Sequence, residues 1–195
     1  MLIVILIISI ILYFLHKYYS ELNLIIEEIV INNNKKKYLV KNTGDKHKAA
    51  QTLYQIEMIL NKLVDMLINN EEKLKYDDMF QYVKKLKNKL SNIQIQENTG
   101  NNNYTSYSIN KGEKLILCIR SKHTDKIHNI NDLVYVAIHE LAHMACPEYH
   151  HTDLFYKINK YLLLKAIEYN LYIYENYNDN NVEYCGIDLN NNILT

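Results

Sequence analysis

Two histidines and a glutamate stand at a spacing that suits metal chemistry. His139, Glu140 and His143 belong to the pentapeptide His-Glu-Leu-Ala-His. On an α-helix, residues four positions apart lie one turn apart on the same face, so both imidazoles can reach one metal ion. Glu140 projects beside them, where it can accept a proton from a water that the metal activates. The pattern therefore predicts a zinc-dependent hydrolytic site.

The residues around this motif predict a buried helix that begins near Asn131 and stops before Pro147. Its apolar residues recur at spacings of three and four: Leu133, Val134, Ala137, Leu141, Met144 and Ala145. Asn131 or Asp132 can cap its start. Buried histidine and glutamate side chains need polar partners, which a metal ion supplies. A chance match of the motif is the alternative, and the bounded, apolar helix argues against it.

A third ligand is expected among the histidines that follow the motif. Catalytic zinc usually keeps three protein ligands and one open position. His150 and His151 come just after Pro147, where a turn lets the chain fold back. Two adjacent residues are a poor pair of ligands for one ion, so the spacing alone leaves the choice between them open.

The segment from His139 to Phe155 also resembles a known family. The pentapeptide, the Pro147-Glu148 pair and the run His151-Thr-Asp-Leu-Phe155 resemble the WLM and SprT-like zinc metallopeptidases. The likeness is greatest to the short WLM-type proteins of large nucleocytoplasmic DNA viruses. In that family the last ligand is a histidine with a bulky aromatic residue four positions later, which fits His151. The family usually has a glycine where this chain has His150, which we expect beside the site or exposed.

This resemblance implies an α+β fold with a zincin-like metallopeptidase domain, in which a small sheet and several helices surround a central helix that carries the motif. It implies one zinc ion per chain, held by His139, His143 and His151. The substrate is then a protein or peptide, whose scissile carbonyl the zinc polarises. Glu140 takes a proton from the attacking water and passes it to the leaving amine.

Tyr184-Cys185-Gly186, near the end of the chain, is similar to a tripeptide of the same viral proteins. Tyr184 is a candidate stabiliser of the transition state, because a phenol can donate a hydrogen bond to an oxyanion. Cys185 is a candidate ligand that caps the zinc in a resting state. For both residues, a role in packing is the alternative.

Composition predicts one domain with an appendage, in a reducing compartment. The length of 195 residues suffices for such a domain. Lysine plus arginine and aspartate plus glutamate number 22 each, so no basic field suggests a specific nucleic-acid partner. Cys118, Cys146 and Cys185 are odd in number and far apart, which is not typical of a disulfide framework. We therefore expect free thiols.

The N-terminus predicts a single-pass membrane anchor over residues 1–19. The run from Leu2 to Leu15 is apolar apart from Ser9 and Tyr13. It is shorter than the usual span of about 20 residues, but Lys17 can snorkel to the interface. A cleavable signal peptide lacks its usual flanking features here, and a buried terminal helix is the other alternative. Later lysines place the catalytic domain on the cytoplasmic side.

Residues 20–37 are expected to form a linker helix and a basic stretch, and residues 38–195 the WLM-like metallopeptidase domain. Within the latter, the patterns predict a strand at 38–41, a long amphipathic helix at 46–67, a second helix from Met79 to Leu90 and a hairpin of 104–108 with 115–120. A strand at the rim of a peptidase cleft commonly binds the substrate backbone. We nominate Leu115–Ile119, with an ordinary sheet strand as the alternative. Thr152 or Asp153 is expected to cap a further helix.

Two other functions are compatible with these patterns. One is a catalytically inactive, zinc-stabilised structural or binding protein of a virion or membrane. The intact Glu140 favours an enzyme over this alternative. The other is a soluble peptidase that acts on proteins crosslinked to DNA, as some relatives in the resembled family do. The apolar N-terminus and the balanced charge argue against it.

Overall fold

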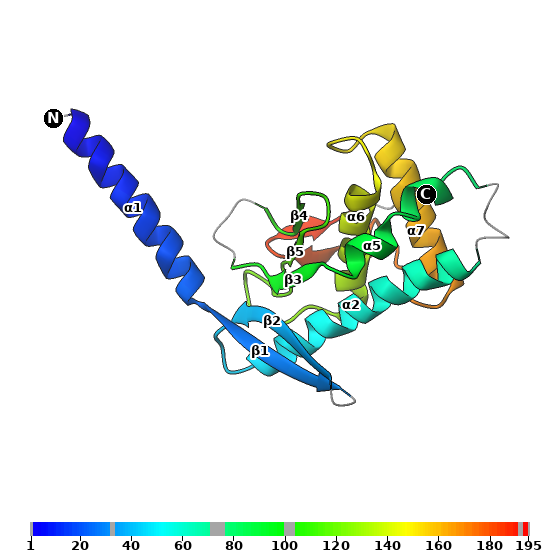
Figure 1. Cartoon of the computed structure of the whole chain (residues 1–195), viewed down its shortest axis with the longest axis horizontal. Coiled ribbons are helices and arrows are strands. Elements are labelled where there is room, and N and C mark those ends of the chain that lie inside the picture. The colour runs from blue at the N-terminus through cyan, green and yellow to red at the C-terminus, as the bar shows by residue number, and fades with distance from the viewer. Residues whose placement is uncertain (1, 32–33, 71–76, 100–103, 191–192, 195) are drawn as a thin grey trace.

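A mixed five-stranded sheet with helices packed against it forms the centre of the chain. The computed structural model describes residues 2–31, 34–70, 77–99, 104–190 and 193–194 (Figure 1). The strands are β1 (Leu24–Ile31), β2 (Asn34–Lys41), β3 (Gln94–Glu97), β4 (Tyr107–Ile109) and β5 (Lys114–Leu117). Their order in the sheet is β1-β2-β3-β5-β4. The α+β class is therefore confirmed.

Pairing within the sheet places β4 at its outer edge. β1 pairs with β2 and β4 pairs with β5 in antiparallel fashion, whereas β2–β3 and β3–β5 are parallel. Because β5 lies between β3 and β4, both of its edges are occupied. The nomination of Leu115–Ile119 as a substrate-binding strand is therefore wrong, and its alternative, an ordinary sheet strand, holds.

The long helix α2 (Lys46–Asn69) joins the sheet to the helices of the metal motif. It contacts β1, β2 and β3 of the sheet and also α6 (Ile130–Ala145). Its apolar stripe is fully buried: Leu53, Ile56, Leu60, Leu63 and Leu67. Each such side chain contributes roughly 1.5–3 kcal/mol by leaving water. The predicted helix at 46–67 is confirmed, and it packs against α6.

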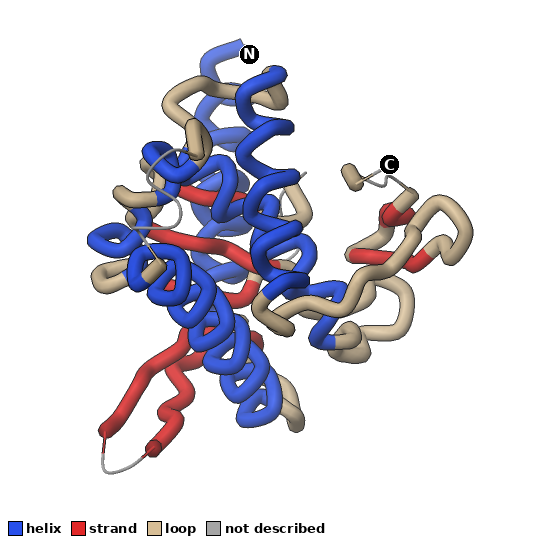
Figure 2. Tube along the Cα trace, turned by 90° about the vertical axis from the view of Figure 1, so that its right-hand side faces the viewer, coloured by secondary structure: helices blue, strands red, loops and turns tan. Residues whose placement is uncertain are grey.

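Three further helices pack against α2, α6 or one another. α4 (Phe80–Val83) and α5 (Leu86–Leu90) occupy the predicted second helix. They are separated only at Lys84 and Lys85, whose backbone stays right-handed helical. α7 (Asp153–Glu168) packs against α6. Figure 2 shows the helices gathered around the sheet, with the β1–β2 hairpin projecting beyond them.

The N-terminal part differs from the prediction. α1 (Leu2–Leu22) extends away from the rest of the chain (Figure 1). Among the residues described, no helix is both long enough and apolar enough to cross a membrane. The predicted anchor over residues 1–19 is therefore wrong, and so is the single-pass membrane localisation with a cytoplasmic catalytic domain. The physical reason is that the apolar run ends at Leu15 and the helix continues through Lys17 and Glu21, whereas a span needs about 20 apolar residues.

The predicted linker helix is a strand instead. Leu24–Ile31 is rich in β-branched isoleucine and valine, which favour a pleated strand, and it pairs along its length with β2. The basic stretch lies on β2 and is neutralised locally. Lys35 and Lys37 lie 3.3 and 3.2 Å from the carboxylate of Glu28, and Lys36 pairs with Glu57.

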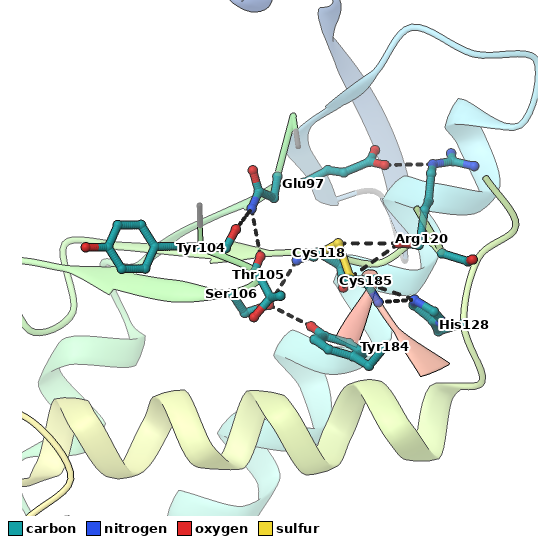
Figure 3. Close-up of a disulfide and its surroundings, with 12 residues drawn as sticks. Glu97, Tyr104, Thr105, Ser106, Cys118, Arg120, His128, Tyr184 and Cys185 are labelled. Atoms are coloured by element: carbon teal, nitrogen blue, oxygen red, sulfur yellow. Dashed lines mark hydrogen bonds and ion pairs between the residues drawn. A yellow bond between two sulfur atoms is a disulfide. The ribbon is translucent and has the colours of Figure 1, made fainter. Parts of the chain in front are cut away.

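A disulfide joins the C-terminal hairpin to the sheet. β6 (Val182–Tyr184) and β7 (Ile187–Leu189) form a separate two-stranded sheet, and Cys185 in their turn is bonded to Cys118, directly after β5 (Figure 3). The prediction of free thiols is wrong for these two residues. The prediction of a reducing compartment rested on free thiols, so it loses its support. Cys118 and Cys185 are 67 residues apart in the sequence, but in the folded chain their Cα atoms lie 6.3 Å apart, which allows a disulfide. Cys146 is free and buried.

Candidate metal centre

Three imidazoles converge on one point beside α6. His139 and His143 come from α6, and His151 comes from the turn before α7. The Nε2 atom of His151 lies 3.1 Å from that of His139 and 3.1 Å from that of His143. Nitrogen ligands held tetrahedrally about 2.0 Å from one zinc ion lie roughly 3.3 Å apart. The donor set and spacing therefore fit one metal ion, and these three residues could bind one.

Hydrogen bonds fix the start of α6. The side chain of Asn129 accepts from the backbone N–H of Asn131 at 2.9 Å, so the cap lies just before the predicted candidates. Asn131 instead makes two hydrogen bonds of 2.9 Å to the backbone of Ile173. Asp132 accepts from the Tyr177 hydroxyl at 2.9 Å. These contacts tie the segment after α7 to the helix of the metal motif.

Two lysines fix the end of α6 and the turn that follows. The Lys89 ammonium donates to the carbonyl of Met144 at 2.7 Å. The Lys111 ammonium donates to the carbonyls of Cys146 and Glu148 at 2.6 and 2.8 Å. The last carbonyls of a helix lack partners within it, and cations near that end also favour the helix dipole. The lysines thereby hold the turn that brings His151 back to α6.

The structure places His151 with the other two imidazoles and leaves His150 outside the cluster. His150 is exposed, and its backbone φ is 67°. Glycine adopts this left-handed conformation without strain, whereas a residue with a Cβ does so at a cost. The turn needs a left-handed residue just before His151, and His150 adopts this conformation at that cost.

Phe155 forms the floor beneath the three imidazoles. It is completely buried, and its ring lies 4.1 Å from that of His143, 4.9 Å from that of His139 and 4.8 Å from that of His151. Its backbone N–H donates to the Thr152 hydroxyl at 3.3 Å, which caps α7 as one of the two predicted residues. The cap and the ring together fix His151 relative to α6.

Burial keeps the imidazoles of α6 uncharged. It lowers the pKa of His139 to about 3, with the neighbouring histidines adding to the effect. It also lowers the pKa of His143 to about 4, helped by His151 and Lys111. Neutral imidazoles are the form that binds a metal. Near neutral pH these two side chains therefore need not lose a proton before they bind one.

Glu140 is buried beside the cluster. Only 6% of it is exposed, and desolvation raises the pKa of its carboxyl to about 7, although a hydrogen bond from the backbone of Ser108 acts in the opposite direction. A carboxyl that titrates near neutral pH can both accept and return a proton. Because Ser108 lies on β4, this hydrogen bond also places the outer edge of β4 beside Glu140.

A cleft of about 1790 Å³ opens over the cluster. Its walls come from β4 and the residues before it, α6, the turn at His150, the start of α7 and the C-terminal hairpin. Six tyrosines line it: Tyr104, Tyr107, Tyr135, Tyr149, Tyr156 and Tyr184. A large cleft lined by aromatic rings, with a sheet edge in its wall, suits an extended chain better than a small polar molecule.

Tyr184 lies in the wall of this cleft next to the disulfide (Figure 3). Its hydroxyl is 2.7 Å from that of Ser106, which accepts from the backbone N–H of Cys118 at 2.9 Å. Burial raises the pKa of Tyr184, so its phenol stays protonated. Cys185 cannot cap a metal with a thiolate, because its sulfur is bonded to Cys118. That prediction is wrong.

Asn159 is a residue of the site that the sequence patterns did not single out. It lies on α7, is completely buried, and its amide Nδ2 is 3.4 Å from Nδ1 of His139. The available signal was a polar residue inside an apolar stripe, between Ile158 and Leu162. A buried amide at such a position needs a partner.

Comparison with known proteins gives the chain relatives but no assigned activity. The chain matches no family model and no solved structure, so the WLM or SprT-like identity and the zincin-like fold have no support from these comparisons. It is 38% identical over 157 residues to "Uncharacterized protein R325" of Acanthamoeba polyphaga mimivirus, which covers 80% of this chain and 79% of that protein.

Two shorter similarities involve iridescent viruses. The chain is 44% identical over 63 residues to "Uncharacterized protein 042R" of Invertebrate iridescent virus 3, covering 32% of this chain and 38% of that protein. It is 35% identical over 88 residues to "Uncharacterized protein 136R" of Invertebrate iridescent virus 6, covering 44% and 46%. Given the extent of the first similarity, the chain belongs to the family of large-DNA-virus proteins that includes the mimivirus protein R325.

Proposed function

We propose that the chain is a zinc-dependent peptidase. The observation that carries the proposal is the convergence of His139, His143 and His151, with the buried Glu140 next to them in the wall of a large cleft. The WLM or SprT-like class is the finer form of the proposal, and the segment from His139 to Phe155 supports it. A triad of imidazoles open to a cleft on one side suits catalytic zinc, which keeps a position free for water or substrate.

When bound, zinc would act as a Lewis acid that polarises the scissile carbonyl and makes water more acidic. Glu140 takes the proton of the attacking water and returns it to the leaving amine, for which a pKa near 7 is well placed. Ser108 fixes the direction of this carboxylate through its backbone N–H.

We propose that the substrate backbone pairs with the outer edge of β4. β4 pairs with β5 on one side, and no other strand in the described residues pairs with its other side. Tyr107 and Ser108 of β4 line the cleft. An extended peptide that pairs with this edge passes beside Glu140, so strand addition brings its peptide bonds to the metal centre.

The third ligand can be tested by metal content. We expect the purified protein to contain one zinc per chain by elemental analysis and to cleave an unfolded protein substrate until a chelator removes the metal. His151→Ala should lose the zinc, because it removes one of three donors. His150→Gly should keep it, since the left-handed backbone at this position accommodates glycine. Loss of zinc in the His150 variant alone would contradict the assignment, and an absence of zinc in the wild type would contradict the proposed function.

Tyr184 can be tested with the loss of a single oxygen atom. We expect Tyr184→Phe to lower kcat by roughly 100-fold, the typical cost of removing one oxyanion donor, with little change in KM. Tyr149→Phe is the matched control, because Tyr149 also lines the cleft but is 74% exposed. Steady-state kinetics with a fluorogenic peptide would measure both variants. Equal kcat values for Tyr184→Phe and the wild type would leave Tyr184 with a packing role only.

A further inference from the structure

Asn159 contacts the cluster of three imidazoles through His139, and its side-chain oxygen has no hydrogen-bond partner among the residues described. Its side chain is completely buried on α7, one turn beyond Phe155. Its Nδ2 lies 3.4 Å from Nδ1 of His139, whereas its Oδ1 has no hydrogen-bond partner among the residues described. A buried amide oxygen without a partner costs about 1–3 kcal/mol, so this arrangement calls for an explanation.

The two nitrogens of His139 have different neighbours. Its Nε2 faces the Nε2 of His151, where the three imidazoles meet, so Nδ1 is the nitrogen that faces away from the cluster. A neutral imidazole that offers Nε2 as a ligand carries its proton on Nδ1 and donates it. The group opposite Nδ1 must therefore be an acceptor. An amide N–H there would place two donors face to face.

Rotation of the Asn159 amide by 180° resolves this conflict. Oxygen and nitrogen of a carboxamide have nearly the same size, so the rotation keeps the packing and exchanges only the two polar atoms. It brings the unpaired oxygen to Nδ1 of His139 and moves the amino group to the position where the oxygen had no partner. The number of unpaired polar atoms does not rise, and the contact between two donors disappears.

We propose that Asn159 is a positioning residue that accepts the Nδ1 proton of His139 and thereby holds Nε2 ready as a metal ligand. This inference rests on the proposed metal site. Ligand histidines usually donate their other N–H to a carboxylate or a carbonyl oxygen, and loss of that acceptor typically weakens metal binding by 10–100-fold. A neutral amide supplies the acceptor without burying a charge on α7.

Two substitutions separate the acceptor from the shape of the side chain. Asn159→Asp keeps an oxygen acceptor and loses the amide donors, whereas Asn159→Leu has a similar size and lacks both. Competition with a chromophoric chelator would give the Zn²⁺ affinity of each variant without any peptide substrate. We expect Leu to weaken binding by 10–100-fold, and Asp to bind within threefold of the wild type or more tightly.

A matched control and a spectroscopic readout distinguish positioning from a general loss of packing. Thr52→Val also replaces a buried polar side chain by an apolar one, but on α2 outside the cleft, and it should leave Zn²⁺ affinity unchanged. The visible bands of the Co²⁺-loaded protein report on ligand geometry, and we expect them to change in Asn159→Leu and to persist in Asn159→Asp. Thermal unfolding of the metal-free variants shows whether each one folds.

The outcomes are decisive in each case. Wild-type Zn²⁺ affinity and Co²⁺ bands in a folded Asn159→Leu variant would overturn the inference, even if that variant melted at a lower temperature. If Asn159→Leu does not fold, Asn159→Asp decides: affinity within threefold of the wild type supports the inference, and any larger loss overturns it. A wild-type protein that binds no metal would refute the proposed function itself, whereas equal binding by the wild type and the Leu variant would refute only the role of Asn159.

Discussion

Replacing Glu140 with glutamine is expected to abolish peptide hydrolysis while leaving the zinc in place. Glutamine keeps the shape of the side chain but cannot accept the proton of the attacking water. Removal of a general base typically costs 100- to 10,000-fold in rate. The three imidazoles are untouched, so elemental analysis should still find one zinc per chain. Glu148→Gln, which changes an exposed carboxylate in the rim of the same cleft, is the matched control and should remain active.

The same substitution should stabilise the metal-free protein at high pH. Folding raises the pKa of Glu140 from 4.5 to about 7, so between these values the folded state binds more protons than the unfolded state. The free energy of unfolding therefore falls as the pH rises from 4.5 to 7, by roughly 3 kcal/mol in total. Glutamine does not titrate and avoids this loss.

Urea unfolding of the chelator-treated proteins at pH 4, 6 and 8 would measure the effect. We expect Glu140→Gln to exceed the wild type by up to about 3 kcal/mol at pH 8 and to match it near pH 4, where both side chains are neutral. A difference that does not vary with pH would show that the carboxylate is not desolvated in the way the structure indicates. Residual hydrolysis at the wild-type rate would remove Glu140 from the reaction.

Breaking the Cys118–Cys185 disulfide is expected to lower both stability and activity without removing the metal. A crosslink between residues 67 positions apart restricts the unfolded chain, which is worth about 4 kcal/mol. Cys185 follows Tyr184 directly and belongs to a hairpin that does not join the five-stranded sheet. Without the crosslink, Tyr184 and the cleft-lining residues of β7 lose their covalent link to the sheet. The metal ligands lie elsewhere, on α6 and before α7.

The double variant Cys118→Ser, Cys185→Ser tests this expectation. Its unfolding midpoint in urea should fall, its kcat should drop at least tenfold because a misplaced group loses much of its effect, and its zinc content should not change. Treatment of the wild type with a phosphine reductant, which carries no thiols that would bind the zinc, should have the same effect, and treatment of the variant should have none. Thiol titration of the unfolded, unreduced wild type should find only Cys146. Three reactive thiols at that stage would show that the bond does not form.

The parts of the fold that could be predicted are those specified by local patterns. The stripe of α2, the apolar spacing of α6 and the Thr152 cap of α7 all act within one element, so the sequence displays them directly. The histidine motif is local in the same sense, because one helical turn aligns its two imidazoles. The zincin-like assignment went beyond such patterns, and no solved structure supports it.

The parts that could not be predicted depend on distant partners. Leu24–Ile31 has an apolar pattern compatible with a helix or a strand, and its pairing with β2 decides for the strand. The position of β5 inside the sheet follows from β3, which lies outside the hairpin of β4 and β5. The disulfide and the contact of Asn159 with His139 both join segments that the sequence keeps apart. For α1, the apolar run was known to be short, and the expectation that Lys17 would extend its usable length was wrong.

The position of Phe155 links occupancy of the cluster to folding. Its ring belongs to the hydrophobic core and is also the surface on which all three imidazoles rest. Any ion that holds the imidazoles together therefore also holds α7 against α6, and its binding free energy adds to that of folding. The protein without an ion at this site should therefore unfold more readily and be cleaved faster by an added protease than the ion-bound form.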